Sequence, residues 1–475
     1  MLSFPTLPTL TLDESERKTL AALQRSAWRP RTDMLESKSY YDGTQPIHNL
    51  RIAVPKQLED VLRTIVGWGA QAVDPYVARL GVDCFRVPTA TDGDQHIADL
   101  MTANDFAAEQ GLAFHDALKL GRAYFSVGSP VEKGDAPVIA VESPMNTTVL
   151  WDLRSKTPKA AQQEYWEGDS ARMALLMPFK TIHLAMNDKT EWEVVDRDDH
   201  GFDFVPLVRM AHGATSDNRD GVSAITAAMR SLIDGACRTL LALEVAREIY
   251  STPGMLILGA TEDMFQNADG SPKAAWDTYI TSVLALERDD EGNLPEIKQK
   301  VAYDPSVFTK ILDWYASAMS GLVLSPPQNM GLYTQGNPAS AESVVAMNSE
   351  RDLHTKNVLH PQFGGSLVKV AQMALRFENK GKLPDEFKTL AVDWDSVALP
   401  TPGVTSDAVT KEIAAGAVPA TSDVVLKRLG YNAVDRRRLE QDRKRDDGRK
   451  AAQAIADSLT QRATPEQASG SLAGL

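Results

Sequence analysis

The segment from Val222 to Tyr250 places the tightest limit on how this 475-residue chain folds. Its apolar side chains recur every three or four residues, which is the period of an amphipathic helix. At 1.5 Å per residue, such a helix is about 40 Å long, which exceeds the usual length of a helix in a globular protein. The chain is therefore expected to contain an elongated helical part. The apolar stripe consists of Ile225, Met229, Leu232, Ile233, Ala236, Leu240 and Leu243.

A second helix of the same kind is predicted to begin at Asp304-Pro305. Aspartate is a favourable N-cap residue, and proline suits the first helical position because its missing N–H has no partner there. Apolar residues follow at helical spacing through residue 324. The insert between the two helices, residues 251–303, mixes a strand-like "GMLILGA" with a helical pattern and a polar stretch. An insert between two such helices forms a projecting tip.

The loop that follows, residues 325–339, is unusually apolar for a connection between helices. Pro326-Pro327 ends the preceding helix, because the second proline can neither donate a hydrogen bond nor continue the turn. Met330, Leu332 and Tyr333 then need a surface to contact. The pattern leaves two interpretations open: these side chains contact another molecule, or they pack under the chain's own helices.

Another long helical pattern begins at Asn337-Pro338, a second capping signal, and runs to about residue 378. Proline at 361, directly after His360, predicts a kink or a break in it. The stretch "LAVDWDSVALP" near residues 390–400 reads as one more strand.

The first 220 residues predict an α+β body. A helix of about six turns is expected over residues 55–83, and another from Ala98 to a terminating glycine at Gly121. From Arg122 the apolar period changes to that of strands, and short runs separated by Gly, Pro, Asn and Asp predict an antiparallel sheet region of about seven strands over residues 122–212. The whole chain is thus α+β and mainly helical.

Composition excludes several classes of protein. Hydrophobic residues make up 43% of the chain, which is enough for a sizeable core, and no run of 18 apolar residues predicts a transmembrane helix. The N-terminus lacks the basic and apolar regions of a secretory signal. The two cysteines, Cys84 and Cys237, indicate buried thiols in a reducing compartment. The net charge of −14 argues against a surface that grips nucleic acid throughout.

The C-terminal part, residues 403–460, predicts short helices followed by a charged one, and residues 461–475 read as a disordered tail. The basic tract from Arg436 to Lys450 has two interpretations. It contacts nucleic acid, or it is a solvated helix whose Glu440, Asp442, Asp446 and Asp447 pair with basic residues three or four positions away. Aromatic residues for base stacking are absent from the tract, which favours the solvated helix.

Catalytic motifs are weak or missing. The sequence has no phosphate-binding P-loop, no G-x-S-x-G turn, no H-E-x-x-H and no paired C-x-x-C. Asp196–His200 brings three carboxylates and a histidine together, which suits a divalent cation, although a solvated hairpin turn is the favoured interpretation. Asp393 and Asp395 lie two positions apart on a predicted strand and share a face, but lack an evident catalytic partner. His354 and His360 are interpreted as structural or surface residues.

The order of these parts resembles that of portal proteins of tailed bacteriophages, in the variety common among siphophages of actinobacteria. The resemblance spans about residues 40–459. It rests on "YYDG" at 40–43, "ARLGVDCFR" at 78–86, "AFHDALKLGRAYFSVG" at 113–128, "PVIAVESPMNTTVLWD" at 137–152 and, most specifically, the passage from Asp304 to Leu367 with "SPPQNMGLYTQGNPASAE" at its centre.

The resemblance implies a subunit of a ring, usually of 12 copies, with DNA passing through a central channel. It implies a wing of helices and antiparallel sheet at residues 1–220, stem helices at 221–250 and 304–324, and a clip at 251–303. A tunnel loop at 325–339, a long kinked helix with a return to the wing at 340–402, and a helical crown at 403–460 complete the implied architecture.

The resemblance also implies candidate functional residues in three of these parts. Channel-facing candidates in the tunnel loop are Gln328, Asn329, Met330, Leu332, Tyr333, Gln335 and Asn337. Clip candidates for contact with the packaging motor or an adaptor are Asp263, Asp289, Asp290, Glu291, Lys298 and Lys300. The crown's basic tract contributes Arg436, Arg437, Arg438, Arg443, Lys444 and Arg445.

The implied role is structural and non-enzymatic, without a cofactor or a membrane. The expected partners are other copies of the chain, the major capsid protein, the large terminase subunit, head–tail adaptor proteins and double-stranded DNA. The expected location is the portal vertex of a virion, after assembly in the host cytoplasm. The alternatives are another phage head or connector protein, and a soluble acidic metal-dependent enzyme.

Overall fold

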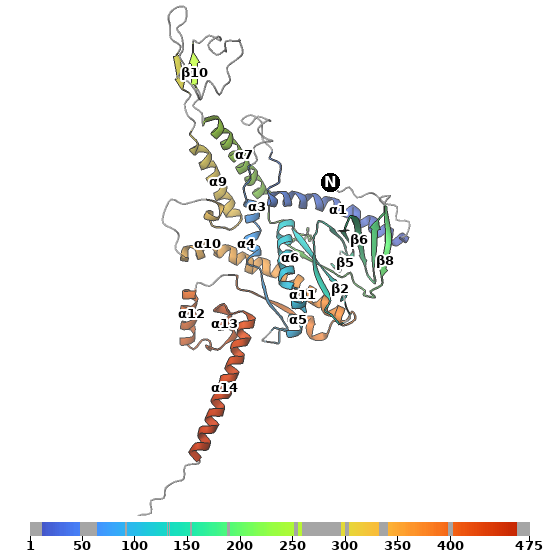
Figure 1. Cartoon of the computed structure of the whole chain (residues 1–475), viewed down its shortest axis with the longest axis vertical. Helices are drawn as coiled ribbons and strands as arrows, with labels where there is room; N and C mark the ends of the chain where they lie inside the picture. Colours follow the sequence, from blue (N-terminus) through green and yellow to red (C-terminus); the bar gives the residue numbers. More distant parts are fainter. Residues whose placement is uncertain are drawn as a thin grey trace, which may run out of the picture. The chain divides into compact units, whose positions relative to one another are not determined.

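The computed structural model describes residues 12–47, 64–90, 93–130, 132, 134–152, 154–187, 191–250, 255–258, 296–299, 304–331, 341–397 and 402–462. The chain divides into two compact units. Unit 1 comprises Met1–Pro30, Pro75–Val222 and Asp352–Leu475, and unit 2 comprises Arg31–Asp74 and Ser223–Arg351. Figure 1 shows the elements in chain order by colour.

Unit 1 contains two antiparallel sheets among its described residues, which confirms the strand pattern predicted for residues 122–212. The larger sheet joins, in sequence order, β4 (Thr147–Trp151), β5 (Pro158–Glu167), β6 (Ser170–Met177), β7 (Lys180–Met186) and β8 (Trp192–Asp198). The smaller sheet has the order β3-β2-β9, with β2 (Arg122–Gly128), β3 (Val138–Glu142) and β9 (Leu207–Ala211). Seven predicted strands were one too few, because the last predicted run divides into β8 and β9 in different sheets.

Helices pack on the smaller sheet: α6 (Phe106–Leu120) and α11 (His360–Glu378) both contact β2 (Figure 1). Phe114 of α6 stacks on Phe363 of α11 with 5.6 Å between ring centroids, and both rings are fully buried. Apolar burial of this size is the main stabilising contribution to a core.

The helix predicted from Ala98 to Gly121 is in fact two helices. It ends as predicted at Gly121, whose φ of +93° is a left-handed cap that glycine adopts without strain. The break occurs between α5 (Gln95–Ala103) and α6, because Asp105 has φ +46° and this conformation interrupts a right-handed helix.

The first turns of α1 (Glu14–Asp42) pack on the larger sheet. Leu12, Leu20 and Leu23 are buried against strand residues that include Trp192. Asp13 and Glu16 form a reciprocal N-terminal cap: Glu16 N–H donates to Asp13 Oδ1 at 2.8 Å, and Asp13 N–H donates to Glu16 Oε2 at 3.0 Å. The helix start is thereby fixed at this point of the sheet.

Glu16 is 1% exposed and accepts hydrogen bonds from two basic residues of the sheet. Arg197 contacts both of its oxygens, at 2.6 and 2.9 Å, and Lys180 Nζ lies 2.5 Å from Oε1. The bidentate Arg197 contact, aided by Lys180, lowers the pKa of Glu16 from 4.5 to about 2, although burial opposes the shift. The Glu16 carboxylate therefore remains charged although it is buried at the edge of the core.

Glu16→Gln is expected to destabilise unit 1 by about 2–3 kcal/mol at neutral pH, because it removes the buried carboxylate that pairs with Arg197 and Lys180. The folded pKa lies below the unfolded one, so this contribution is present above about pH 4.5 and is lost as the pH falls toward 2. Urea unfolding of both proteins across this range measures the difference. Glu14→Gln, whose partner Lys18 is 75% exposed, is the matched control and is expected to change stability by less than about 0.5 kcal/mol.

A strand pair links distant parts of unit 1. β1 (Val82–Arg86) pairs antiparallel with β12 (Ala391–Trp394), which confirms the strand predicted near residues 390–400. The helix predicted over residues 55–83 is wrong in its described half. Residues 64–66 are not helical, and only the short helices α3 (Trp68–Gln71) and α4 (Asp74–Val77) precede β1. Gly67 and Pro75 interrupt the pattern, because glycine favours the unfolded backbone and proline cannot donate to the preceding turn.

The long helical pattern after residue 340 stays continuous through its proline. α10 (Ala341–His354) leads into a π-helical turn, η3 (Thr355–Leu359), and then into α11. The wider π turn lies directly before His360-Pro361, where it accommodates the missing N–H of the proline. The irregularity was predicted at this position, and its form is a π turn within a continuous helical run.

Unit 2 is built around two long helices, α7 (Ala227–Tyr250) and α9 (Ser306–Leu322), which lie side by side in Figure 1. The predicted start at Val222 is five residues early. α9 begins at Ser306, so Pro305 takes the N-cap position predicted for Asp304. The Asp304 carboxylate still lies at this helix start, where it accepts from Ser306 N–H at 2.9 Å and from Ser306 Oγ at 2.6 Å. Between the helices, β10 (Met255–Leu258), predicted as a strand, pairs with β11 (Glu296–Gln299).

The C-terminal part of unit 1 is helical, as predicted: α12 (Pro402–Ala414), α13 (Asp423–Arg428) and α14 (Ala433–Arg462) follow the short η4 (Asp385–Thr389). The predicted disordered tail lies, from residue 463 on, outside the described residues. No helix in the described part of the chain has the length and apolarity needed to cross a membrane.

Candidate interaction sites

The α7–α9 pair is in close contact at Gly235. A Cβ atom at this position would lie 2.6 Å from Cζ of Tyr315, so the absence of a side chain leaves room for the Tyr315 ring. The predicted apolar stripe is buried at Ile225, Met229, Ile233 and Ala236, whereas Leu232 is half-buried. Beyond Ala236, Leu241 and Val245 are buried in place of Leu240 and Leu243, which are half-buried.

The far face of α9 exposes large apolar side chains. The helix buries Ala316, Met319 and Ser320. The opposite face of α9 carries a stripe of apolar side chains at helical spacing. Their exposed fractions in the single chain are 42% for Val307, 39% for Ile311, 63% for Trp314 and 43% for Leu322. Apolar side chains aligned along one exposed helix face form a candidate surface for contact with another protein.

The "YYDG" motif fastens the end of α1 to α7 within unit 2. Tyr40 donates its hydroxyl to Asp234 at 2.9 Å, and burial together with this carboxylate raises the pKa of Tyr40 to about 12. Gly69 fits directly against this turn, because a Cβ there would lie 2.2 Å from the Tyr40 carbonyl oxygen. The motif is therefore a structural anchor for the long helix.

The apolar loop after α9 is partly described, and it answers the question left open for Met330. The turn η2 (Pro327–Met330) contacts α9, and Met330 is 5% exposed. Met330 thus packs under its own helix in the single chain, which is the second interpretation given above, and this burial disfavours its selection as a channel-facing residue. Gln328 and Asn329 are exposed on the same turn.

The remaining tunnel-loop candidates, Leu332, Tyr333, Gln335 and Asn337, lie outside the described residues. So do five of the clip candidates: Asp263, Asp289, Asp290, Glu291 and Lys300. Lys298 is described. It is exposed on β11 and lies 3.2 Å from Glu296.

The first basic residues of α14 bind unit 1's own strands. Arg436 Nη2 lies 2.7 Å from Asp83 Oδ2, and the two side chains are 11% and 5% exposed. Lys427 of α13 adds contacts to Asp83 at 3.5 Å and to Asp393 at 3.9 Å. Arg437 donates to the Gly93 carbonyl at 3.0 Å and to Gln95 at 2.6 Å. Arg436 and Arg437 are therefore anchors for the C-terminal helices.

Arg436→Ala is expected to loosen these helices, because it removes the closest cation from the buried Asp83. Losing one partner of a buried pair costs about 3 kcal/mol. Hydrogen exchange should show faster exchange in β1 and in the first turns of α14. Arg438→Ala is the control, since Arg438 is 75% exposed and reaches only Asp435 at 3.9 Å. Equal protection in the two variants would contradict the anchor.

The rest of the basic tract pairs mainly within its own helix. Lys444 lies 2.7 Å from Glu440, Arg445 lies 3.9 Å from Asp442, and Arg443 donates to the Thr421 carbonyl at 3.0 Å. The contacts of Lys444 and Arg445 agree with the interpretation of the tract as a solvated helix.

Of the carboxylates considered for catalysis, Asp393 forms an ion pair within unit 1. Asp393 pairs with Arg86 at 2.8 Å, and burial raises the pKa of Asp395, aided by Asp83. In the Asp196–His200 stretch, Arg197 turns toward Glu16, and the His200 Nδ1 accepts from Phe202 N–H at 3.1 Å. The described residues contain no group of three His, Cys, Asp or Glu side chains that is placed to hold a metal ion.

The histidines and cysteines have structural surroundings. His360 stacks on Trp394 at 4.2 Å, and burial lowers its pKa to about 4. His354 lies edge-on to Tyr76 at 5.7 Å. Burial raises the pKa of Cys84 to about 11 and also raises that of Cys237, so both thiols stay protonated near neutral pH.

Sequence comparison gives the class of the protein. Residues 21–427 match the family of phage portal proteins described as SPP1 Gp6-like. The chain belongs to this family of portal proteins.

Two curated relatives illustrate the relationship. The chain is 28% identical over 418 residues to the portal protein of Mycobacterium phage L5, covering 86% of this chain and 84% of the relative. It is 28% identical over 425 residues to the portal protein of Mycobacterium phage D29, covering 87% and 86%.

Similar solved structures come from gene transfer agent particles. A chain in the virion of the native particle has a TM-score of 0.47 and 16% identity, covering 88% of this chain and 99% of that chain. A chain in the neck of the native particle, computed with C12 symmetry, has a TM-score of 0.43 and 15% identity, covering 84% and 98%.

Proposed function

We propose that the chain forms a closed ring, usually of 12 copies, at one capsid vertex, and that DNA enters and leaves the capsid through its central channel. The family match over residues 21–427 carries this proposal. The role is structural. The terminase motor, head–tail adaptors and the major capsid protein are the partners that such a ring requires, and the ring assembles in the host cytoplasm before it enters the virion.

The α7–α9 pair is the proposed stem, and its exposed stripe is the proposed contact with the next copy. Trp314 lies near the middle of this stripe and is 63% exposed in the single chain. A ring uses head-to-tail contacts between two different surfaces, so one helix face remains uncovered until a neighbour arrives. Burying aromatic and aliphatic side chains of this kind is the main source of affinity in such contacts.

The turn η2 is the proposed approach to the channel. Gln328 and Asn329 are its exposed side chains, and residues 325–339 contain no lysine or arginine. A wall of this kind meets DNA by steric and polar contact. Because phosphate binding depends on cations, an acidic ring lets a duplex slide without holding it.

Electron microscopy of the purified full chain tests the proposal. Negative-stain images over a range of salt and protein concentrations should show rings with a central opening. Native mass measurement should show one dominant species, and twelve copies of the 51.9 kDa chain give about 620 kDa. Monomers and dimers alone under all conditions, including in the presence of capsid protein, would count against the ring.

A further inference from the structure

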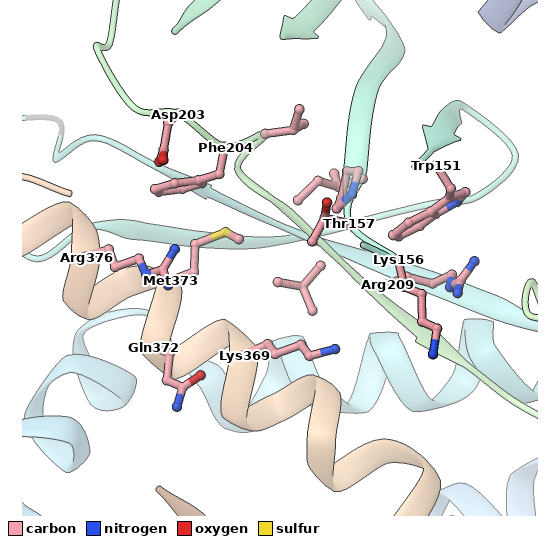
Figure 2. A pocket seen from close by; sticks show the side chains of 14 residues that line it. Trp151, Lys156, Thr157, Asp203, Phe204, Arg209, Lys369, Gln372, Met373 and Arg376 are labelled. Carbon is pink, nitrogen blue, oxygen red and sulfur yellow. The ribbon is translucent and has the colours of Figure 1, made fainter. Parts of the chain in front are cut away.

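A pocket of about 400 Å³ lies in unit 1 between strands and helix α11 (Figure 2). The end of β4 supplies Trp151, β9 supplies Arg209, and α11 supplies Lys369 and Arg376. Half-buried Phe204 and Met373 add apolar surface. A volume of this size suits a few side chains or a small ligand, and it is too small for a nucleic-acid duplex.

The pocket is strongly cationic within an acidic chain. Lys156, Arg209, Lys369 and Arg376 line it, against a single carboxylate, Asp203. Arg209 is already paired with Asp220. The side chains of Lys156 and Lys369 are exposed, and neither has an ion-pair partner among the residues that the structure describes. Two cations at the rim are thus available to an incoming anion.

The aromatic rings of the pocket are already covered. The Arg209 guanidinium lies 4.1 Å over the Trp151 ring. Arg376 lies 5.4 Å over the Phe204 ring, and Phe202 stacks on Phe204 at 5.3 Å with an interplanar angle of 13°. A nucleobase would have to displace these groups from the ring faces in order to stack there, so the arrangement favours carboxylates over bases.

We propose that this pocket binds an acidic peptide segment of another protein. Carboxylates of the segment pair with Lys156 and Lys369 at the rim, and an apolar side chain packs against Phe204 and Met373. Charge complementarity selects such a partner. The site is complete within one copy of the chain, because every lining residue belongs to unit 1.

The test measures fluorescence anisotropy of a fluorescein-labelled peptide of alternating glutamate and leucine, mixed with the full chain at low salt. The peptide should bind, and the same peptide with glutamine in place of glutamate should bind at least about tenfold more weakly. Lys369→Glu and Lys156→Glu should each weaken binding about tenfold. Lys159→Glu is the matched control, because Lys159 is exposed on β5 but does not line the pocket, and it should leave binding nearly unchanged.

Three results would overturn the proposal. The first is equal binding of the glutamate and glutamine peptides, and the second is equal weakening by Lys369→Glu and Lys159→Glu. The third concerns other occupants. If Lys369→Glu abolishes binding of a thymidine oligonucleotide, the pocket is a nucleic-acid site, and if it changes the native mass of the assembled chain, the occupant is a second copy.

Discussion

Gly221→Ala is expected to destabilise unit 1 by at least about 4 kcal/mol and to sharply reduce soluble expression. Gly221 has φ +82°, a left-handed conformation that costs an alanine about 1 kcal/mol. A Cβ there would also lie 2.4 Å from the Gly121 carbonyl oxygen and 2.5 Å from the His212 carbonyl oxygen. Both obstacles are backbone atoms, so no side-chain rotation relieves the clash.

The surrounding hydrogen bonds make this junction rigid. His212 N–H donates to Gly121 O at 2.9 Å, and Val222 N–H donates to His212 O at 2.9 Å. The His212 ring lies 2.7 Å from the Val222 carbonyl through Nδ1, which must carry the proton, and burial lowers the pKa of this histidine. Moving the backbone away from an alanine would break these bonds.

Gly111→Ala is the matched control for this experiment. Gly111 lies in the middle of α6, and a Cβ there would meet no atom within 4 Å. Alanine has the higher helix propensity, so the control should stabilise the protein by about 0.5–1 kcal/mol. Thermal unfolding followed by dye binding compares the two variants. Equal stability would show that the backbone does not approach Gly221 as closely as described.

Trp314→Glu is expected to abolish the assembled ring while leaving the single chain folded. Trp314 is 63% exposed within the chain, so its replacement removes little of the chain's own packing. In the proposed contact between copies, the new carboxylate would be buried without a partner, which costs several kcal/mol at every interface of the ring. Native mass measurement should show monomers, and the circular dichroism spectrum should remain that of the parent chain.

Thr309→Glu introduces the same side chain elsewhere on α9 and serves as the control. Thr309 is exposed and lies away from the apolar stripe, so this variant should assemble like the parent chain. The stripe is not the interface if the Trp314 variant still forms rings of unchanged mass.

Local sequence signals predicted several helix boundaries correctly, because their physical cause lies within a few residues. Gly121 ends α6 through its own backbone freedom, and Asp304 accepts hydrogen bonds from Ser306, the first residue of α9. The face of a helix that packs against the rest of the protein was harder to predict. The α9 pattern contained apolar residues on two faces, and the sequence did not distinguish the face that packs on α7 from the exposed one.

Long-range contacts explain what the sequence could not predict. The predicted helix over residues 55–83 ran into the start of β1, because the strand identity of β1 depends on pairing with β12 about three hundred residues later. The role of Arg436 as an anchor depends on Asp83, 353 positions away in sequence. The pocket next to Lys369 was missed for the same reason, since its walls come from β4, β9 and α11.

A three-dimensional reconstruction of the purified assembly tests the central proposal most directly. It should show a closed ring with an open axial channel, in which Gln328 and Asn329 approach the axis, Met330 packs on its own α9, and the Trp314 stripe contacts the neighbouring copy. An assembly without an axial opening, or one with η2 on its outer surface, would contradict the proposal.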